Sequence, residues 1–280
     1  MLRLGAFAGR LAPYALDPAA ASHEALRQVT RRLGLVLSGG FLRGAFQVGV
    51  IEALHARGVR FEVVVGISSG AWNAACIATE QIAEMRSFWI AVARAPKLRL
   101  KNLWRYGTPS NFPEIVRRIP MRRLRFERLS DSGVRLRIGA LALRDRRLHF
   151  FDGWDDRQAF FASLMASNYL PGIYGYPLPV AGRYYADGGL IDNVPYEAAF
   201  AAGCERAVVV VADPQGRIWK RPFAARPHTI PTSARARLTV IHPQAPLPIG
   251  RVRALPEAVL HCLDAGHRAV ARAVAAGRFD

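Results

Sequence analysis

A serine between two glycines is the residue of this sequence best placed to do chemistry. An apolar, β-branched run ends in Gly66-Ile67-Ser68-Ser69-Gly70, and an alanine-rich helical pattern follows. A strand that turns sharply into a helix in this way holds the hydroxyl of the central serine out at the end of a sheet. A side chain at Gly66 or Gly70 would collide with the neighbouring strand or helix. The pattern therefore predicts an acyl hydrolase with Ser68 as its nucleophile.

A second candidate segment is the loop Ser38-Gly39-Gly40-Phe41-Leu42-Arg43-Gly44, between a predicted buried strand at 33–37 and a predicted helix at 44–56. Small residues let backbone N–H groups converge on a negative atom there, and the helix N-terminus adds positive potential. Such a loop serves either a phosphate or the oxyanion of an acyl-transfer intermediate. The phosphate alternative is weaker, because the loop has neither the P-loop lysine nor the spacing Gly-x-Gly-x-x-Gly.

The third candidate is Asp187, which follows a short predicted strand and precedes Gly188 and Gly189. A carboxylate in a glycine-flanked turn can approach another loop closely, as the general base of a serine must. Taken alone, however, Asp-Gly-Gly is more typical of an ordinary turn.

A histidine base is the rival mechanism for the same serine, since a Ser-His-Asp triad needs a histidine after the acid. Four histidines follow Asp187 in the sequence: His228, His242, His261 and His267. His228 falls in a predicted loop, and His261 and His267 fall in the last predicted helix. His242, directly after a predicted strand, is the only serious candidate for a triad.

The order of elements predicts where these segments lie. Two strand–loop–helix units, at 33–56 and 59–79, predict a parallel sheet with right-handed crossovers. Further strands are predicted at 134–143, 147–151, 183–186, 207–212 and 238–241, and further helices at 23–32, 80–95, 158–168, 195–202 and 255–277. Residues 97–132 are predicted to form short helices and loops, and residues 213–235 an exposed loop.

Length and composition predict one globular α/β domain. The chain has 280 residues, of which 51% are hydrophobic and 21% charged. We expect an N-terminal extension at 1–32, a catalytic core at 33–212, and a loop, strand and helix at 213–280 that complete the same domain. No apolar run is long enough to predict a membrane-spanning helix, and basic residues and a proline interrupt any signal-peptide core near the N-terminus.

The cysteines and the charge indicate the surroundings of the protein. Cys76, Cys204 and Cys262 are widely spaced, which predicts buried free thiols, a reducing compartment and a cytoplasmic location. The formal net charge is +18, and eleven arginines lie between Arg117 and Arg147. This excess of positive charge is consistent with peripheral attachment of the protein to an anionic membrane surface. It is equally consistent with an arginine-rich face that is only solvated. Nucleic acid is a weaker candidate, because no nucleic-acid-binding module is recognisable.

Taken in order, the three segments resemble those of the patatin-like phospholipase family. That family has a glycine-rich oxyanion loop after the first strand, Gly-x-Ser-x-Gly about thirty residues on, and Asp-Gly-Gly or Asp-Gly-Ala much later. The flanks agree too: Gly44-Ala45-Phe46-Gln47 after the first motif, Ala166-Ser167 and Pro171 before Asp187, and Asp192-Asn193-Val194-Pro195 after it. The resemblance covers about 33–211 and implies a three-layer α/β sandwich around a mainly parallel sheet.

The resemblance also implies a mechanism, namely hydrolysis of acyl-lipid esters by a Ser–Asp dyad without metal or cofactor. By position, Ser68 is the nucleophile and Asp187 the base. The backbone N–H groups of Gly39, Gly40 and Phe41, together with that of Ser69, would form the oxyanion hole. Six residues would support these motifs: Arg43, Gly44, Gly66, Gly70, Gly188 and Gly189. Arg43 matches a basic residue of the family, with loop support or attraction of an anionic headgroup as its possible roles.

Phe41 departs from the family pattern, which has a third glycine at this position. A bulky residue is disfavoured at positive φ. Either Phe41 keeps a negative φ with its N–H directed inward, or the oxyanion hole is impaired, and one lost donor costs on the order of a hundredfold in rate. The competing hypothesis is a protein of the same fold that binds lipid or polyanions with little activity. The acyl chain, headgroup, cleaved position and oligomeric state stay open.

Overall fold

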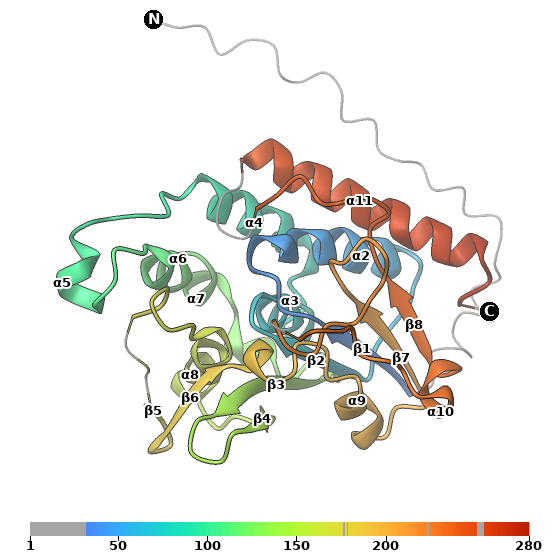
Figure 1. The fold of residues 1–280 in the computed structure, drawn as a ribbon, viewed down its shortest axis with the longest axis horizontal. Helices are drawn as coiled ribbons and strands as arrows, with labels where there is room; N and C mark the ends of the chain where they lie inside the picture. Colours follow the sequence, from blue (N-terminus) through green and yellow to red (C-terminus); the bar gives the residue numbers. More distant parts are fainter. Residues whose placement is uncertain (1–31, 176, 178, 223, 251–254, 280) are drawn as a thin grey trace, which may run out of the picture.

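The computed structural model describes residues 32–175, 177, 179–222, 224–250 and 255–279, and shows an α/β sandwich (Figure 1). Its strands pair into one sheet in the order β5-β6-β3-β2-β1-β7-β8, and β4 pairs with β3 beside this path. The strands are β1 Leu33–Leu37, β2 Val63–Ile67, β3 Arg135–Ala142, β4 Arg147–Phe151, β5 Pro179–Val180, β6 Arg183–Asp187, β7 Arg206–Val210 and β8 Leu238–Ile241.

The neighbouring strands β3, β2, β1, β7 and β8 are parallel to one another. Strands β4 and β6 pair antiparallel with β3, and β5 pairs antiparallel with β6. In the register, Ile67 of β2 lies opposite Gly139 of β3, and the next residue, Ala140, lies opposite Asp187 of β6. The antiparallel addition of β6 therefore carries Asp187 to the end of β2. This pairing was not predicted, because parallel βαβ units dominate the sequence pattern.

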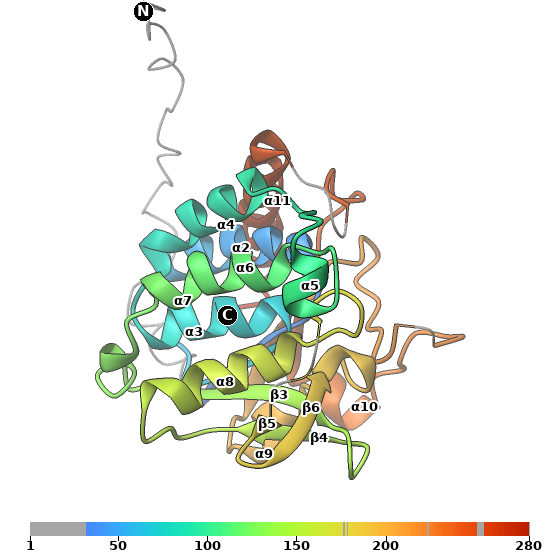
Figure 2. The ribbon, with the colours of Figure 1, turned by 90° about the vertical axis from the view of Figure 1, so that its left-hand side faces the viewer.

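Helices cover both faces of the sheet, which confirms the predicted three-layer fold class. On one face, α2 Gly44–Ala56, α3 Ser69–Ala78, α4 Met85–Arg94, α8 Arg157–Asn168 and α11 Pro256–Ala275 share a core with Leu35 and Leu37 of β1. On the other face, α9 Glu197–Ala201 and α10 Thr232–Arg235 pack over Val36 and Val65. Figure 2 shows α5 Asn102–Tyr106, α6 Phe112–Arg118 and α7 Pro120–Arg123 along one side of the molecule.

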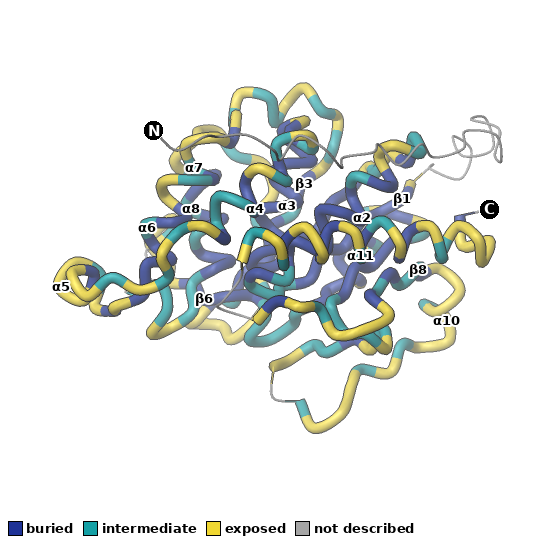
Figure 3. The backbone as a smooth tube through the Cα atoms, turned by 90° about the horizontal axis from the view of Figure 1, so that it is seen from above, coloured by how far each residue is buried: buried dark blue, intermediate teal, exposed yellow. Residues whose placement is uncertain are grey.

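The C-terminal segment contributes to the same sheet and core. β8 pairs in parallel with β7, and α11 crosses α2 so closely that a Cβ at Gly49 would lie 1.9 Å from the carbonyl oxygen of Leu263. Buried residues run along β1, α2, α3 and the inner side of α11 in Figure 3. Within the described residues, no helix has both the length and the apolar character needed to span a membrane.

Most predicted elements are confirmed, and the differences are local. The strands at 33–37 and 238–241 and the helix at 44–56 have the predicted bounds. The second strand begins at Val63, not at 59, and the helix predicted at 80–95 is divided into a 3₁₀ turn, Ile82–Glu84, and α4. The predicted loop 213–235 is not wholly exposed, because Ile218 is buried and pairs with His228.

The three cysteines are buried and form no disulfide with one another, as predicted. The predicted helix at 23–32 and the extension at 1–32 lie outside the described residues, except for Arg32.

Candidate active site

Ser68 occupies a strained turn between β2 and α3. Its φ of 53° and ψ of −123° are unusual for a residue with a side chain. The predicted need for glycine on both sides is confirmed: a Cβ at Gly66 would lie 2.5 Å from Cα of Ala71, and one at Gly70 would lie 2.3 Å from the carbonyl oxygen of Leu37. The turn therefore lies directly against the backbone of β1 and α3.

The last residues of α8 hold the backbone of Ser68 on both sides. Its N–H donates to Oγ of Ser167 over 2.9 Å, and its carbonyl oxygen accepts from Nδ2 of Asn168 over 3.1 Å. The hydroxyl of Ser167 donates in turn to the carbonyl oxygen of Gly139 over 2.7 Å. These buried bonds fix the turn from a segment about a hundred residues away. In the sequence, Ser167 stands out only as a flanking residue of the family pattern, and no neighbouring residue indicates that it bonds to Ser68.

Asp187 lies beside Ser68, as the sequence analysis predicted. The hydroxyl of Ser68 interacts with the Asp187 carboxylate, which accepts a hydrogen bond from the N–H of Gly189 over 2.8 Å. The carboxyl group is buried, and this burial raises its pKa to about 7, against the lowering effect of its interactions with Ser68 and Gly189. The base candidate is thus poised to exchange a proton near neutral pH.

The glycine-rich loop lies against the same turn. Gly39 donates its N–H to Oδ1 of Asn193 over 2.9 Å, and its carbonyl oxygen accepts from Nδ2 of Asn193 over 3.2 Å. The N–H of Gly40 donates to Oγ of Ser69 over 3.0 Å. The expectation that Gly39 and Gly40 present free donors therefore does not hold in this structure, because side chains already accept from both.

Two other N–H groups are available by their position in the chain. Phe41 is the first residue of the 3₁₀ turn Phe41–Arg43, and Ser69 is the first residue of α3. The first N–H groups of a helix have no intrahelical acceptor and lie at its positive end. Of the four predicted oxyanion donors, Phe41 and Ser69 thus fit the role best.

Phe41 has a φ of 53°, so the expected alternative of a negative φ is wrong. Its ring packs edge-on against Phe112, with centroids 6.2 Å apart, and Phe112 packs in turn against Tyr174. This contact offsets part of the cost of the left-handed backbone, which is on the order of 1 kcal/mol or more. The loop thus keeps the turn that glycine usually makes.

The remaining motif residues bring the segments together. A Cβ at Gly44 would lie 2.6 Å from the ring of Trp89. A Cβ at Gly188 would lie 2.7 Å from the carbonyl oxygen of Gly139, and one at Gly189 would lie 2.8 Å from Oδ1 of Asn193. Arg43 lies close to Cys262 of α11. Burial raises the pKa of the Cys262 thiol to about 12, and the positive charge of Arg43 lowers this pKa in part. Its two predicted roles remain predictions.

An apolar cavity of about 70 Å³ opens beside Ser68. This volume is several times the roughly 10–15 Å³ that one water molecule needs. Its wall is formed by Phe41, Ser68, Trp72, Phe88, Phe112 and Tyr174, among others. The indole N–H of Trp72 is buried without a partner among the described residues. An apolar substrate chain matches such a lining.

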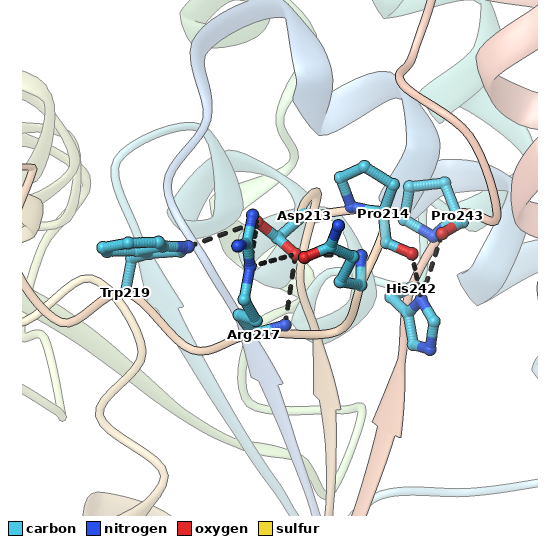
Figure 4. Close-up of polar contacts among 7 residues, drawn as sticks. Asp213, Pro214, Arg217, Trp219, His242 and Pro243 are labelled. Atoms are coloured by element: carbon cyan, nitrogen blue, oxygen red, sulfur yellow. Dashed lines mark hydrogen bonds and ion pairs between the residues drawn. The ribbon is translucent and has the colours of Figure 1, made fainter. Parts of the chain in front are cut away.

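The histidines do not reach this site. Nδ1 of His242 lies 3.1 Å from the carbonyl oxygen of Pro214 and 3.0 Å from that of Pro243, beside the Asp213–Arg217 ion pair (Figure 4). His228 contacts Tyr196, and His267 contacts Glu52. In the described part of the chain, none of the four histidines that follow Asp187 contacts Ser68 or Asp187. Among the same residues, no group of three or more His, Cys, Asp or Glu side chains is arranged to hold a metal ion.

The chain belongs to the patatin-like phospholipase family, since the family profile described as "Patatin-like phospholipase" matches residues 35–200. Among its relatives, "Uncharacterized protein YjjU" of Escherichia coli is 26% identical over 64% of this chain and 51% of that protein. "Lysophospholipase NTE1" of Mycosarcoma maydis is 31% identical over 64% of this chain and 9% of that protein. The chain thus spans about half or less of these relatives.

Two solved structures share the fold. VipD from Legionella pneumophila matches with a TM-score of 0.52 and 15% identity over 86% of this chain and 66% of its own. Human GIVD cytosolic phospholipase A2, in complex with methyl gamma-linolenyl fluorophosphonate, matches with a TM-score of 0.55 and 12% identity over 91% of this chain and 60% of its own. At these identities the likeness concerns the fold alone.

Proposed function

We propose that this protein is a serine acyl hydrolase that cleaves acyl esters of lipids, of the phospholipase A or lysophospholipase type, with Ser68 as nucleophile and Asp187 as base. The observation that carries the proposal is the interaction of the Ser68 hydroxyl with the buried Asp187 carboxylate at a strained strand-to-helix turn. Family membership and the name of the NTE1 relative support the lipid substrate.

The first step forms an acyl-enzyme. Oγ of Ser68 attacks the ester carbonyl carbon while its proton passes to the Asp187 carboxylate. The negative charge that develops on the carbonyl oxygen accepts hydrogen bonds from the N–H groups of Phe41 and Ser69. When the intermediate collapses, the proton on Asp187 passes to the departing alcohol oxygen, and the acyl group stays on Ser68.

The second step returns the enzyme. Asp187 takes a proton from a water molecule, whose oxygen attacks the acyl carbonyl carbon. The same two N–H groups stabilise the second oxyanion. Collapse breaks the bond to Oγ of Ser68, the proton returns to that oxygen, and the fatty acid leaves. The acyl chain would occupy the apolar cavity beside Ser68, whose aromatic wall suits it.

Labelling with a fluorophosphonate, followed by mass mapping, tests this proposal. The reagent should modify Ser68, and Ser68→Ala and Asp187→Asn should each lower hydrolysis of p-nitrophenyl acyl esters by a factor on the order of a thousand or more. His242→Ala is the matched control and should keep near-normal activity, because its ring lies on Pro214 and Pro243. Substantial hydrolysis by Ser68→Ala would contradict the proposal.

The low-activity binding protein would give a different result. The occupied N–H groups of Gly39 and Gly40 are the observation that favours it over a fully active enzyme. In that case, the fluorophosphonate would leave Ser68 unmodified and no acyl ester would turn over.

A further inference from the structure

The segment 96–111, which carries α5, reverses the usual placement of polar and apolar residues. Four apolar side chains within seven residues face solvent: Leu98 is 70%, Leu100 83%, Leu103 53% and Trp104 94% exposed. Scattered exposed apolar residues are ordinary, but a cluster of this kind marks an interaction site. Figures 1 and 3 show α5 as a projection at one end of the molecule.

The base of this projection is built from buried polar contacts. Nδ2 of Asn102 donates to the carbonyl oxygen of Ser110 over 3.0 Å and to Oδ1 of Asn111 over 3.1 Å. The N–H of Arg99 bonds to the carbonyl oxygen of Pro109, and the N–H of Asn111 to that of Lys97, both over 2.8 Å. The projection is therefore a formed hairpin whose apolar tip has been left outside the core.

The charge of the projection is of one sign. Residues 96–113 include four basic residues, Lys97, Arg99, Lys101 and Arg105, and no acidic ones. Glu114, which follows, is mostly buried and already pairs with Arg105 and Arg118. Among the described residues, neither Arg99 nor Lys101 has an acidic partner. A cationic, apolar tip of this kind complements a surface that is negative outside and apolar beneath.

The projection also shares its base with the wall of the cavity beside Ser68. The hairpin leads directly into α6, whose Phe112 and Ile115 line that cavity. On the other side, Oγ1 of Thr108 donates to the carbonyl oxygen of Gly172 over 2.6 Å, between the cavity-lining residues Leu170 and Tyr174. Whatever the tip binds is thus held next to the cavity.

We propose that Leu98, Leu100, Leu103 and Trp104, with Arg99 and Lys101, form a docking surface for anionic phospholipid bilayers. The leucines and the indole enter the interface between headgroups and acyl chains, where tryptophan and leucine are favoured. The basic side chains stay at the anionic headgroups. This surface differs from the arginine-rich segment 117–147 that the sequence singled out. The proposal concerns binding and holds independently of the chemistry at Ser68.

Cosedimentation with vesicles tests the docking surface. The full chain carrying Ser68→Ala, which prevents hydrolysis of the vesicles, should bind vesicles of phosphatidylcholine and phosphatidylglycerol more tightly than phosphatidylcholine alone. Leu100→Ser with Trp104→Ser should weaken this binding at least about tenfold. The matched control, Leu143→Ser with Tyr184→Ser, removes two exposed apolar side chains elsewhere and should bind normally. Arg99→Gln with Lys101→Gln should cost about fivefold for each charge and reduce the salt dependence.

A second measurement locates the tip directly. Brominated lipids should quench tryptophan fluorescence in the parent chain, and Trp104→Leu, which keeps the tip apolar, should bind vesicles but lose most of that quenching. Equal binding by the tip variant and the control pair would overturn the proposal. It would also fall if the tip variant converted a dimer into a monomer in light scattering while vesicle binding stayed unchanged, because a second copy would then cover the tip.

Discussion

Two turns of the candidate site have the same backbone torsion but are held in different ways. Ser68 and Phe41 each have a φ of 53°, and each follows a buried parallel strand and precedes a helix. Around Ser68 the side chains of Ser167 and Asn168 hold the backbone, and backbone atoms also confine the chain, because Gly66 and Gly70 lie against Ala71 and the carbonyl oxygen of Leu37.

The loop at Phe41 is held by side-chain contacts without this close backbone packing. Asn193 bonds to both polar backbone groups of Gly39, Ser69 accepts from Gly40, and the ring of Phe41 leans on Phe112. Backbone strain costs on the order of 1–3 kcal/mol per residue, and it persists only where the surroundings fix it. We infer that the turn at Ser68 tolerates almost no substitution, whereas the loop at Gly39–Phe41 can vary, as Phe41 itself illustrates.

The largest expected difference between the two turns comes from adding one methyl group to each. Gly70→Ala places Cβ against the backbone of β1, and should lower the free energy of unfolding by about 4 kcal/mol or more and abolish hydrolysis. Gly39→Ala instead meets Oδ1 of Asn193 at 2.6 Å, which is a side-chain atom that can move. It should cost clearly less in urea unfolding, and Asn193→Ala should rescue part of the loss. An equal loss for Gly39→Ala would remove the distinction.

The second expected effect concerns Asp187, the proposed base beside the turn at Ser68. Its folded pKa of about 7 lies above the ordinary 3.8, so the folded state binds the extra proton between these values. The contribution of Asp187 to stability therefore falls as the pH rises from about 4 to 7 and is constant above that range. Asp187→Asn should unfold at a higher temperature than the parent, by a margin that grows over this range and then levels off.

The same titration should appear in the rate. Because the base must be ionised, kcat/KM of the parent should rise through pH 7 and then reach a plateau. A Tm difference between Asp187→Asn and the parent that does not change with pH would contradict the raised pKa.

The third effect tests whether α8 positions Ser68. Ser167→Ala leaves the N–H of Ser68 buried without its acceptor, which costs about 1–3 kcal/mol, and should reduce kcat by a factor on the order of ten to a hundred. Ser163, also buried on α8, bonds to Trp154 and Phe160 and touches neither turn. Ser163→Ala should therefore lose similar stability in thermal unfolding while kcat stays near normal. Equal losses of kcat in the two variants would show that Ser167 has only a structural role.

The smallest effect is expected in the loop at Gly39–Phe41, the proposed oxyanion loop. Phe41→Gly removes about 1 kcal/mol of backbone strain together with the contact to Phe112, so its stability should change little. The N–H at this position is retained, and kcat for a short ester should stay within about threefold, whereas one lost oxyanion donor would cost a hundredfold. KM for a long-chain ester should rise, because the cavity loses an aromatic wall. A large loss of kcat would show that the ring, and not only the backbone, shapes the oxyanion hole.

Much of the site could be predicted from short segments. The turn at Ser68, the need for glycine at Gly66 and Gly70, and the helix that follows depend on steric contacts within a few residues. The pairing of Ser68 with Asp187 was predicted only through the resemblance to a family, and the free N–H groups expected at Gly39 and Gly40 were not found. Nothing near Asn193 or Ser167 in the sequence indicates which distant backbone group each one binds.

The sequence by itself thus determined the alternation of strands and helices, the two glycine-bounded turns and the chemical types of the candidate residues, because periodicity and local sterics act over short stretches of chain. The tertiary structure alone decided that Asp187 reaches Ser68, since this depends on the antiparallel pairing of β6 with β3. It also decided the positive φ of Phe41 and the exposure of the tip of α5. Contacts between residues about a hundred or more positions apart follow from sheet register and helix packing, which no single segment encodes.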